Sequence, residues 1–239
     1  MRMKVSVLVS KKDPVGQTVK KLGYGFDEVE EDVTDFTYSK GDVIVVLSRH
    51  ESSSKIPTLT VHHVGNPGGT PMGGEPRQLG VAHPRLLTSI FRELRKLNLG
   101  VEIEIEATHH GPTLRGVPVI FAEVGSDETI WRNETLVNRF VESVLRGIEG
   151  VNEVDCRNVV LVYGGPHYSK TAKGLALTNC ISHIISKHFI SELNSEVIHQ
   201  SIERNITRPN TAILDSINRE RREFITNLLR LNNISIEFR

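Results

Sequence analysis

The chain has 239 residues, enough for one large α/β domain or two small ones with a substantial hydrophobic core. Lys and Arg together number 29, as do Asp and Glu, so the formal net charge is zero. A zero sum excludes a global basic field, and we therefore expect no general binding to DNA. Hydrophobic residues make up 38% of the chain and charged residues 24%, a balance that excludes wholesale disorder.

Cysteine usage and hydropathy exclude further classes. Cys156 and Cys180 are too few for a disulfide scaffold or a Cys-rich zinc module, so we expect incidental thiols in an intracellular chain. The apolar run 3–9 has the length of a strand and is too short for a secretory signal. No stretch approaches the roughly 20 apolar residues of a membrane helix. The sequence predicts a cytoplasmic protein without a membrane partner.

Strand and helix patterns alternate along the chain. The predicted strands are 3–9, 42–47, 58–64, 101–107, 117–124, 158–163 and 234–238, and the predicted helices are 14–22, 83–97, 130–148, 171–189 and 212–231. In the strand 101–107, alternation predicts that Glu102, Glu104 and Glu106 lie on a solvated face. Segment 65–80 contains six Gly and three Pro, which predicts a long loop without helix or strand.

No repeat or linker divides the chain. We therefore expect a single α/β domain over residues 1–239, with a mixed, mainly buried sheet and helices on both faces. Ligands of such sheets bind at the carboxyl ends of the strands.

Histidines gather where the predicted strands end. Six of the ten histidines and two carboxylates follow or end five strands: His50, Glu51, His62, His63, His109, His110, Glu123 and His167. Parallel strands would bring these positions together. Imidazole nitrogens and carboxylate oxygens are the ligands that Zn²⁺ takes, and a His backed by a carboxylate acts as a general base without metal.

The alternative for each histidine is a structural or solvated role. We favour that interpretation for His83, His183, His188 and His199, since His83 adjoins a helix start and His188 lies near a predicted helix C-terminus. Neighbours in a strand point to opposite faces, so one member of His62-His63 or His109-His110 can be structural. The sequence contains neither H-E-x-x-H nor H-x-H.

Glycines and basic residues are open to two interpretations as well. Gly164-Gly165 allows close approach to a ligand or an oxyanion, and is equally typical of a tight turn after a strand. Lys170 and Lys173 flank the start of the next helix, and seven Arg lie in the last 36 residues. These cations form either a solvated helix face or a local phosphate patch.

Five motifs together resemble one family. Ser48-Arg-His-Glu51, Val61-His-His-Val-Gly-Asn66, Thr108-His-His-Gly-Pro-Thr113, Ala122-Glu-Val-Gly-Ser126 followed by Trp131, and Tyr163-Gly-Gly-Pro-His-Tyr168 resemble the archaeal and plant type of D-aminoacyl-tRNA deacylase. The resemblance covers residues 40 to 190. It implies a monomeric, cytoplasmic, zinc-containing enzyme with a fold related to peptidyl-tRNA hydrolase and phosphorylase-like α/β proteins. The implied reaction is hydrolysis of the ester that joins a D-amino acid to the 3′ end of tRNA.

The assignment of site residues is our own inference. We predict as catalytic residues His109, His110, Glu123 and His167; as zinc ligands His50, Glu51, His62, His110 and His167; and as substrate-binding residues Gly164, Gly165, Lys170 and Lys173. The backbone N–H groups near Gly164-Gly165 or His110-Gly111 are candidates for an oxyanion hole. Two rival functions stay open from the residues alone. One is a metal-dependent amidohydrolase or peptidase acting on small substrates, and the other is a non-catalytic zinc-binding or RNA-binding module.

Overall fold

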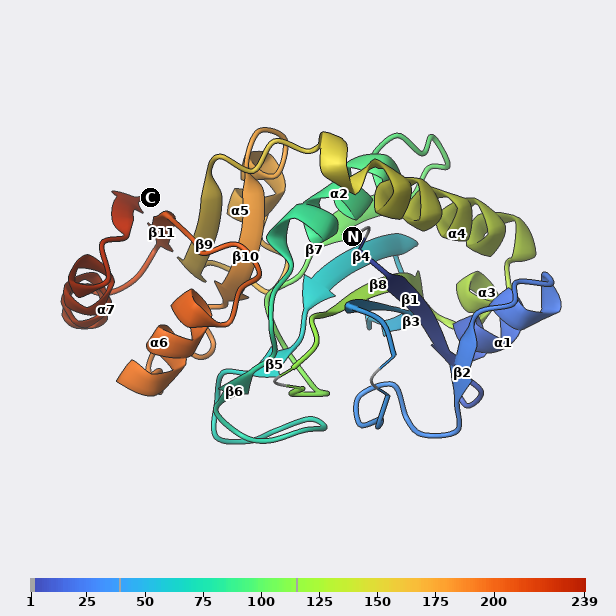
Figure 1. Ribbon diagram of the computed structural model, residues 1–239, viewed down its shortest axis with the longest axis horizontal. Helices are drawn as coiled ribbons and strands as arrows, with labels where there is room; N and C mark the ends of the chain where they lie inside the picture. The colour runs from blue at the N-terminus through green and yellow to red at the C-terminus, as the bar shows by residue number, and fades with distance from the viewer. Residues whose placement is uncertain (1–2, 39, 115) are drawn as a thin grey trace.

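The computed structural model describes residues 3–38, 40–114 and 116–239 (Figure 1). Its helices are α1 (Pro14–Lys21), α2 (Pro84–Leu94), α3 (Glu128–Trp131), α4 (Glu134–Glu149), α5 (Lys170–Leu175), α6 (Ser195–Glu203) and α7 (Arg219–Leu231), with the 3₁₀ turn η1 (Gly150–Glu153) after α4. Its strands are β1 (Val5–Ser10), β2 (Asp27–Val29), β3 (Val43–Glu51), β4 (Thr58–His63), β5 (Gly65–Asn66), β6 (Gln78–Leu79), β7 (Glu102–Ile105), β8 (Val119–Ser126), β9 (Val159–Gly164), β10 (Cys180–Ile185), β11 (Thr211–Asp215) and β12 (Ser235–Phe238). The predicted α/β class is confirmed.

The strands form two main sheets where the sequence predicted one. The larger sheet has the order β2-β1-β3-β8-β4-β7, and the smaller has the order β10-β9-β11-β12. The smaller sheet is parallel throughout. In the larger sheet β4 runs antiparallel to β8 and parallel to β7, which makes this sheet mixed as expected. The carboxyl ends of β4 and β7 therefore lie at one end of the strands of the larger sheet, and the carboxyl ends of β3 and β8 lie at the opposite end.

Helices cover the two sheets differently. In Figure 1, α2 and α4 lie above the larger sheet, and their apolar stripes share one core cluster with β3, β4 and β8. The opposite face is covered by loops, whose Val33 and Phe36 pack with Ile44 and Phe121. The smaller sheet has helices on both faces, since α6 and α7 contribute to the cluster around Leu161, whereas Ala172 of α5 belongs to the cluster of α2 and α4. Among the described residues, no helix thus covers the second face of the larger sheet.

Two predicted helix starts are confirmed with their caps. The Asp13 carboxylate accepts hydrogen bonds from the backbone N–H groups of Val15 (2.9 Å) and Gly16 (3.1 Å) at the start of α1. At the start of α2, His83 Nδ1 accepts the N–H of Leu86 at 3.2 Å. His83 therefore has the structural role that the sequence favoured.

Two predicted helices each contain a strand. The stretch 171–189 consists of α5 and β10, which pairs with β9 through Cys180↔Val159, and 212–231 consists of most of β11 followed by α7. Short apolar runs such as Cys180–Ile185 fit either periodicity, so sequence spacing alone misassigned them. The predicted helix 130–148 is divided into α3 and α4, and α6 was not predicted.

The two cysteines are paired, and the expectation of incidental thiols is wrong. Cys156 and Cys180 form a disulfide with a Cα–Cα distance of 5.3 Å, 24 residues apart in sequence. It joins the segment before β9 to the first residue of β10. Local sequence did not indicate this pairing because the strand assignment of β10 was itself missed.

The Gly-rich segment 65–80 has short strands at both ends. Gly65 pairs with Leu79, and Asn66 pairs with Gln78, in an antiparallel ladder. The prediction that the segment holds no strand is therefore wrong at its ends, while the part between β5 and β6 is a loop that projects from the body of the molecule (Figure 1).

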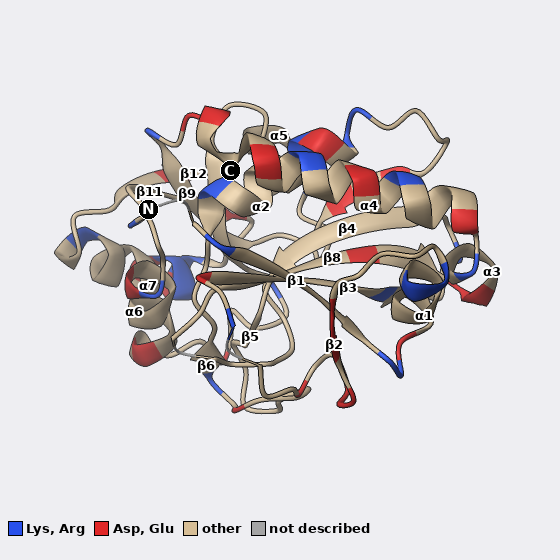
Figure 2. Ribbon diagram, turned by 45° about the vertical axis from the view of Figure 1, so that its right-hand side comes forward, with Lys and Arg blue, Asp and Glu red and all other residues tan. Residues whose placement is uncertain are grey.

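Charge is distributed unevenly over the fold. Figure 2 shows acidic residues along β2 and the turn after it, where 27–35 contains six carboxylates in nine residues. α7 carries four arginines, Arg219, Arg221, Arg222 and Arg230, and Figure 2 shows further basic residues on α1 and α4. No described helix is both long and apolar enough to cross a lipid bilayer.

Candidate active site

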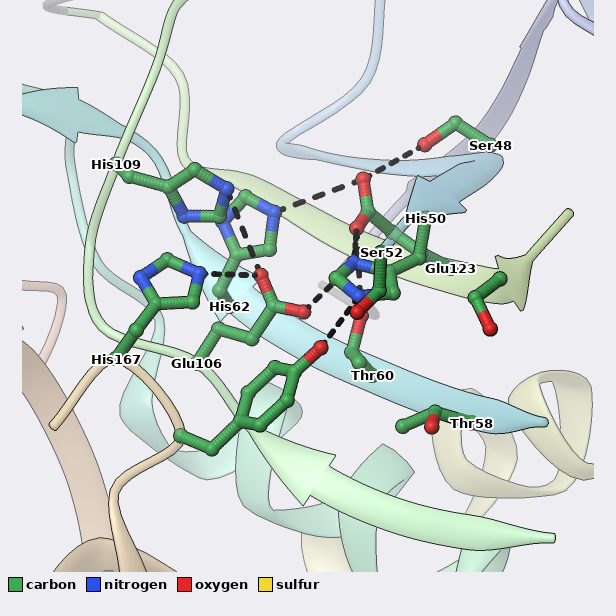
Figure 3. A network of polar contacts seen from close by, with 12 residues as sticks. Ser48, His50, Ser52, Thr58, Thr60, His62, Glu106, His109, Glu123 and His167 are labelled. Carbon is green, nitrogen blue, oxygen red and sulfur yellow. Dashed lines mark hydrogen bonds and ion pairs between the residues drawn. The ribbon is translucent and has the colours of Figure 1, made fainter. Parts of the chain in front are cut away.

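Polar side chains of neighbouring strands meet on the face of the larger sheet that no helix covers (Figure 3). Glu123 of β8 lies opposite Ser48 of β3 and Thr60 of β4. Ser48 Oγ donates to Glu123 Oε1 at 3.1 Å, and Thr60 Oγ1 donates to Oε2 at 3.3 Å. The residues converge because they share one face of the sheet, so the expectation that parallel strand ends would bring them together is wrong for β4 and β7.

His50 lies between two carboxylates. Its Nδ1 is 2.9 Å from Glu106 Oε1 and 3.4 Å from Glu123 Oε2, and its Nε2 is 2.6 Å from Tyr168 Oη. Burial acts to lower the pKa of His50, but the hydrogen bonds to Glu106 and Glu123 outweigh it and raise the pKa to about 11. His50 is therefore a cation that balances part of the buried negative charge.

Glu106 contacts three histidines of the cluster. Besides His50, it faces His167, whose Nε2 is 3.2 Å from Glu106 Oε2, and His109, whose Nε2 is 3.5 Å from the same oxygen. Burial acts to raise the pKa of Glu106, but the hydrogen bonds from His167 and His50 outweigh it and hold the pKa well below its usual range. The side chain is fully buried, so the predicted solvated face of 101–107 is wrong at Glu106.

Three histidine rings pack together beside this carboxylate. The ring centroids of His62 and His109 are 4.1 Å apart, those of His62 and His110 are 4.8 Å apart, and those of His109 and His110 are 4.4 Å apart. In each ring Nδ1 faces a backbone carbonyl oxygen: that of His63 (3.1 Å), Ala107 (2.9 Å) and Gly111 (2.6 Å), respectively. These contacts assign the Nδ1–H tautomer, which leaves each Nε2 as the free nitrogen.

Electrostatics keep two of the three rings neutral. Burial and the nearby His62 lower the pKa of His109 well below its usual range and that of His110 to about 4. Burial also acts to lower the pKa of His62, but its pairing with Glu123 outweighs it and raises the pKa. His62 Nε2 is buried and has no hydrogen-bond partner among the described residues.

A cleft of about 390 Å³ opens over this cluster. The described residues that line it are Asp32, Val33, Thr34, Arg49, His50, Glu51, Met72, His109, His110, Glu123 and His167. Six of the seven histidines and carboxylates predicted as catalytic or metal-binding thus line the cleft, and the seventh, His62, is completely buried.

Three groups of side chains have ligand atoms close enough to share a metal ion, within 4.8 Å of one another: His62, His109 and His110; Glu106, His109 and His167; and His50, Glu106 and Glu123. Glu51 belongs to none of these groups. Sequence reasoning missed Glu106 as a site residue. The signal that could have found it is its position three residues before His109, directly after the alternating strand β7.

The predicted substrate-binding residues lie apart from the described lining of the cleft. Gly164 and Gly165, with φ of +93° and +69°, form the turn after β9, and Gly165 N–H donates to the Asp215 carbonyl oxygen. Lys173 forms an ion pair with Glu104. Gly111 N–H, a predicted oxyanion donor, is hydrogen-bonded to the Met72 carbonyl oxygen at 2.9 Å.

In the adjacent pair His62-His63, the second histidine follows the alternation of the strand. His63 points away from His62 and packs against His183, with ring centroids 5.6 Å apart. His183 Nδ1 is 3.2 Å from Thr108 Oγ1, next to His109 in sequence. This second buried pair anchors the segment that carries His109 and His110 to β10.

Comparison with known proteins shows to which family the chain belongs. A sequence model of the D-aminoacyl-tRNA deacylase family matches residues 37–237. The chain belongs to the D-aminoacyl-tRNA deacylase family. The match extends past the stretch 40–190 in which the sequence motifs were found, and it contains every residue of the buried cluster.

Relatives in this deacylase family align over the whole chain. The D-aminoacyl-tRNA deacylase of Metallosphaera sedula is 61% identical over 99% of this chain and 100% of its own length. That of Saccharolobus solfataricus is 52% identical with the same coverage. A crystal structure of a conserved protein of unknown function, AF0625, has the same fold, with a TM-score of 0.86 and 22% identity over 99% of this chain and 95% of its own.

Proposed function

We propose that the protein hydrolyses the ester bond between a D-amino acid and the 3′ end of tRNA. Water adds to the ester carbonyl, the bond from that carbon to the ribose oxygen breaks, and the products are the free D-amino acid and tRNA. The observation that carries the proposal is the buried His–Glu cluster at the floor of a cleft in a chain that is similar over its full length to deacylases. The relatives supply the substrate class, and the cluster supplies a means to activate water.

We infer that the cluster holds Zn²⁺, and the residues fit that ion. The rings of His62, His109 and His110 each direct Nδ1 to a backbone carbonyl oxygen and Nε2 toward the cluster, the arrangement common in zinc-binding histidines. The unpartnered Nε2 of His62 is a buried nitrogen for which a metal would compensate. The carboxylates of Glu106 and Glu123 are the further donors within reach. A zinc ion bound here would lower the pKa of a coordinated water toward about 7.

We assign His167 as the group that takes the proton from the attacking water. Its Nε2–H donates to the ionised Glu106, which leaves Nδ1 without a proton. Its side chain is 41% exposed at the cleft, whereas Glu106 behind it is fully buried. Glu106 thus fixes the orientation of His167 and stabilises its protonated form, after which His167 returns the proton to the departing ribose oxygen.

The size of the cleft suits one end of the substrate. A volume of about 390 Å³ accommodates an aminoacyl ester and part of the terminal adenosine, and excludes the tRNA body. We infer that the enzyme acts in the cytoplasm as a monomer, as membership of the D-aminoacyl-tRNA deacylase family implies.

The test is deacylation of matched D- and L-aminoacyl-tRNA, each with and without a chelator. We expect release of the D-amino acid, much slower release of the L-enantiomer, loss of activity on chelation and recovery on adding Zn²⁺. Metal analysis of the purified protein gives the number of zinc ions bound per chain. Equal rates for both enantiomers would contradict the proposed substrate, and full activity in metal-free protein would contradict the proposed ion.

A further inference from the structure

Two apolar side chains stand out in an otherwise polar cleft. Among its described lining residues, Val33 and Met72 are the apolar ones, and the others are charged residues, histidines and Thr34. We propose that Val33 and Met72 form the subsite that receives the side chain of the amino acid in the substrate. The proposal rests on the function above and adds to it the part of the cleft that selects among amino acids.

A backbone contact brings the two residues together from distant segments. A Cβ atom built on Gly73 would lie 2.2 Å from the Thr34 carbonyl oxygen, and one built on Gly111 would lie 2.4 Å from the same oxygen. The segment after β2 therefore packs directly on the 65–80 loop and on the turn after His110, with no side chain between them. Val33 directly precedes Thr34 in the chain, and Met72 directly precedes Gly73. The backbone contact therefore brings Val33 and Met72 close together.

The backbone of Met72 is held firmly although its side chain is free. Met72 N–H donates to Asn66 Oδ1 at 3.1 Å, and its carbonyl oxygen accepts the N–H of Gly111. The same Asn66 side chain donates to the Gly73 carbonyl oxygen at 2.7 Å. The Met72 side chain is nevertheless 56% exposed. The fixed backbone keeps this apolar side chain at the cleft, while its rotatable bonds let it adjust to a ligand.

Val33 connects this surface to the catalytic floor. It belongs to one hydrophobic cluster with Phe121 of β8, and the Phe121 ring packs against His62 and His110 with centroid distances of 5.2 and 4.6 Å. A substrate whose ester carbonyl lies over the histidines therefore has the Val33–Met72 wall within reach of its Cα substituent. The apolar character of the Val33–Met72 wall favours substrates with apolar or aromatic side chains over substrates with charged ones.

The chemistry of methionine adds a second expectation. Its side chain is unbranched and polarisable, so it adapts to ligands of different shape. The subsite should accept D-leucine, D-phenylalanine and D-tyrosine with similar efficiency, because Met72 fits itself to each.

The experiment compares M72A with wild type on D-Phe-, D-Leu- and D-Ala-tRNA. We expect kcat/KM of M72A to fall about tenfold for D-Phe- and D-Leu-tRNA and to change little for D-Ala-tRNA, whose methyl group does not reach Met72. M72L, which conserves the volume, should restore most of the loss. L177A is the matched control, since Leu177 is 52% exposed outside the described lining of the cleft.

The outcomes separate this proposal from the proposed function. A loss that grows with side-chain size supports the subsite. An equal loss for all three substrates would show that Met72 acts on the loop and would overturn it, as would no loss for any. Absence of wild-type activity on every D-aminoacyl-tRNA would contradict the function itself, whereas retained D-Ala-tRNA hydrolysis in M72A shows that the function stands whichever way the subsite is decided.

Discussion

Glu106 Oε2 lies 3.2 Å from His167 Nε2, and the two residues come from different sheets that meet beside β7. The meeting is fixed by the backbone, because Ala107 N–H donates to the His167 carbonyl oxygen at 2.8 Å and Ser169 N–H donates to the Ile105 carbonyl oxygen at 3.1 Å. A buried carboxylate and a half-exposed imidazole are thereby held as an acid–base pair at the edge of the cleft.

The first prediction concerns this pair. E106Q keeps the size of the side chain but removes the charge that stabilises protonated His167. We expect the single-turnover rate of D-aminoacyl-tRNA hydrolysis to fall by about two orders of magnitude. E102Q is the matched control, since Glu102 is an exposed residue of the same strand. If E106Q were as active as E102Q, Glu106 would not be part of the catalytic machinery.

A second prediction separates metal binding from proton transfer. H110A should lose bound zinc and activity together, because His110 is one of the three rings with a free Nε2. H167A should lower the rate by about 100-fold or more through loss of the base. Metal content measured beside activity distinguishes the two effects, with the exposed His199 replaced in H199A as the control. Undiminished activity in both H110A and H167A would refute the assignment of the site.

A third prediction concerns stability against pH. Burial lowers the pKa of His183 to about 4, while the unfolded chain has its usual value near 6.5. The unfolded state therefore binds the proton first, and the folded state loses stability as pH falls from 6.5 toward 4. Over that range the contribution of His183 is on the order of 3 kcal/mol.

The measurement for this prediction is the free energy of unfolding in guanidinium chloride at pH 4.5, 5.5 and 7. H183N, whose amide oxygen can accept the Thr108 hydroxyl in place of Nδ1, should flatten the dependence, whereas H199N should leave it steep. Parallel curves for wild type and H183N would show that His183 does not titrate as inferred.

A fourth prediction concerns nucleic acid. The net charge is zero, and six carboxylates lie in 27–35, a segment that also contributes Asp32 and Thr34 to the lining of the cleft. We expect weak tRNA binding that weakens further as salt increases, because few phosphates are contacted, and little affinity for duplex DNA. Fluorescence titrations at two salt concentrations check this. Tight binding that does not respond to salt would be incompatible with recognition of the 3′ end alone.

Much of the site could be predicted from the local sequence. His109-His110 follows a predicted strand, and His50, Glu123 and His167 lie near or after the ends of other predicted strands, so their motifs indicated both the cluster and the family. A helix start with its own capping residue, such as Asp13, could also be predicted, because the cap and the helix lie within a few residues of each other.

The rest depended on contacts between distant segments. Alternation correctly placed Glu102, Glu104 and Glu106 on one face of a strand, but only the packing of β10 and the turn after β9 beside β7 decides that Glu106 is buried against His50 and His167. The direction of β4, the division into two sheets, the Cys156–Cys180 disulfide and the approach of Met72 to Val33 are equally non-local. The sequence by itself determined the family and most of the candidate site histidines, because side-chain type and local spacing are written in the chain. Tertiary structure alone decided which of them meet and how they are charged, because burial and electrostatic pairing arise from neighbours that are far away in sequence.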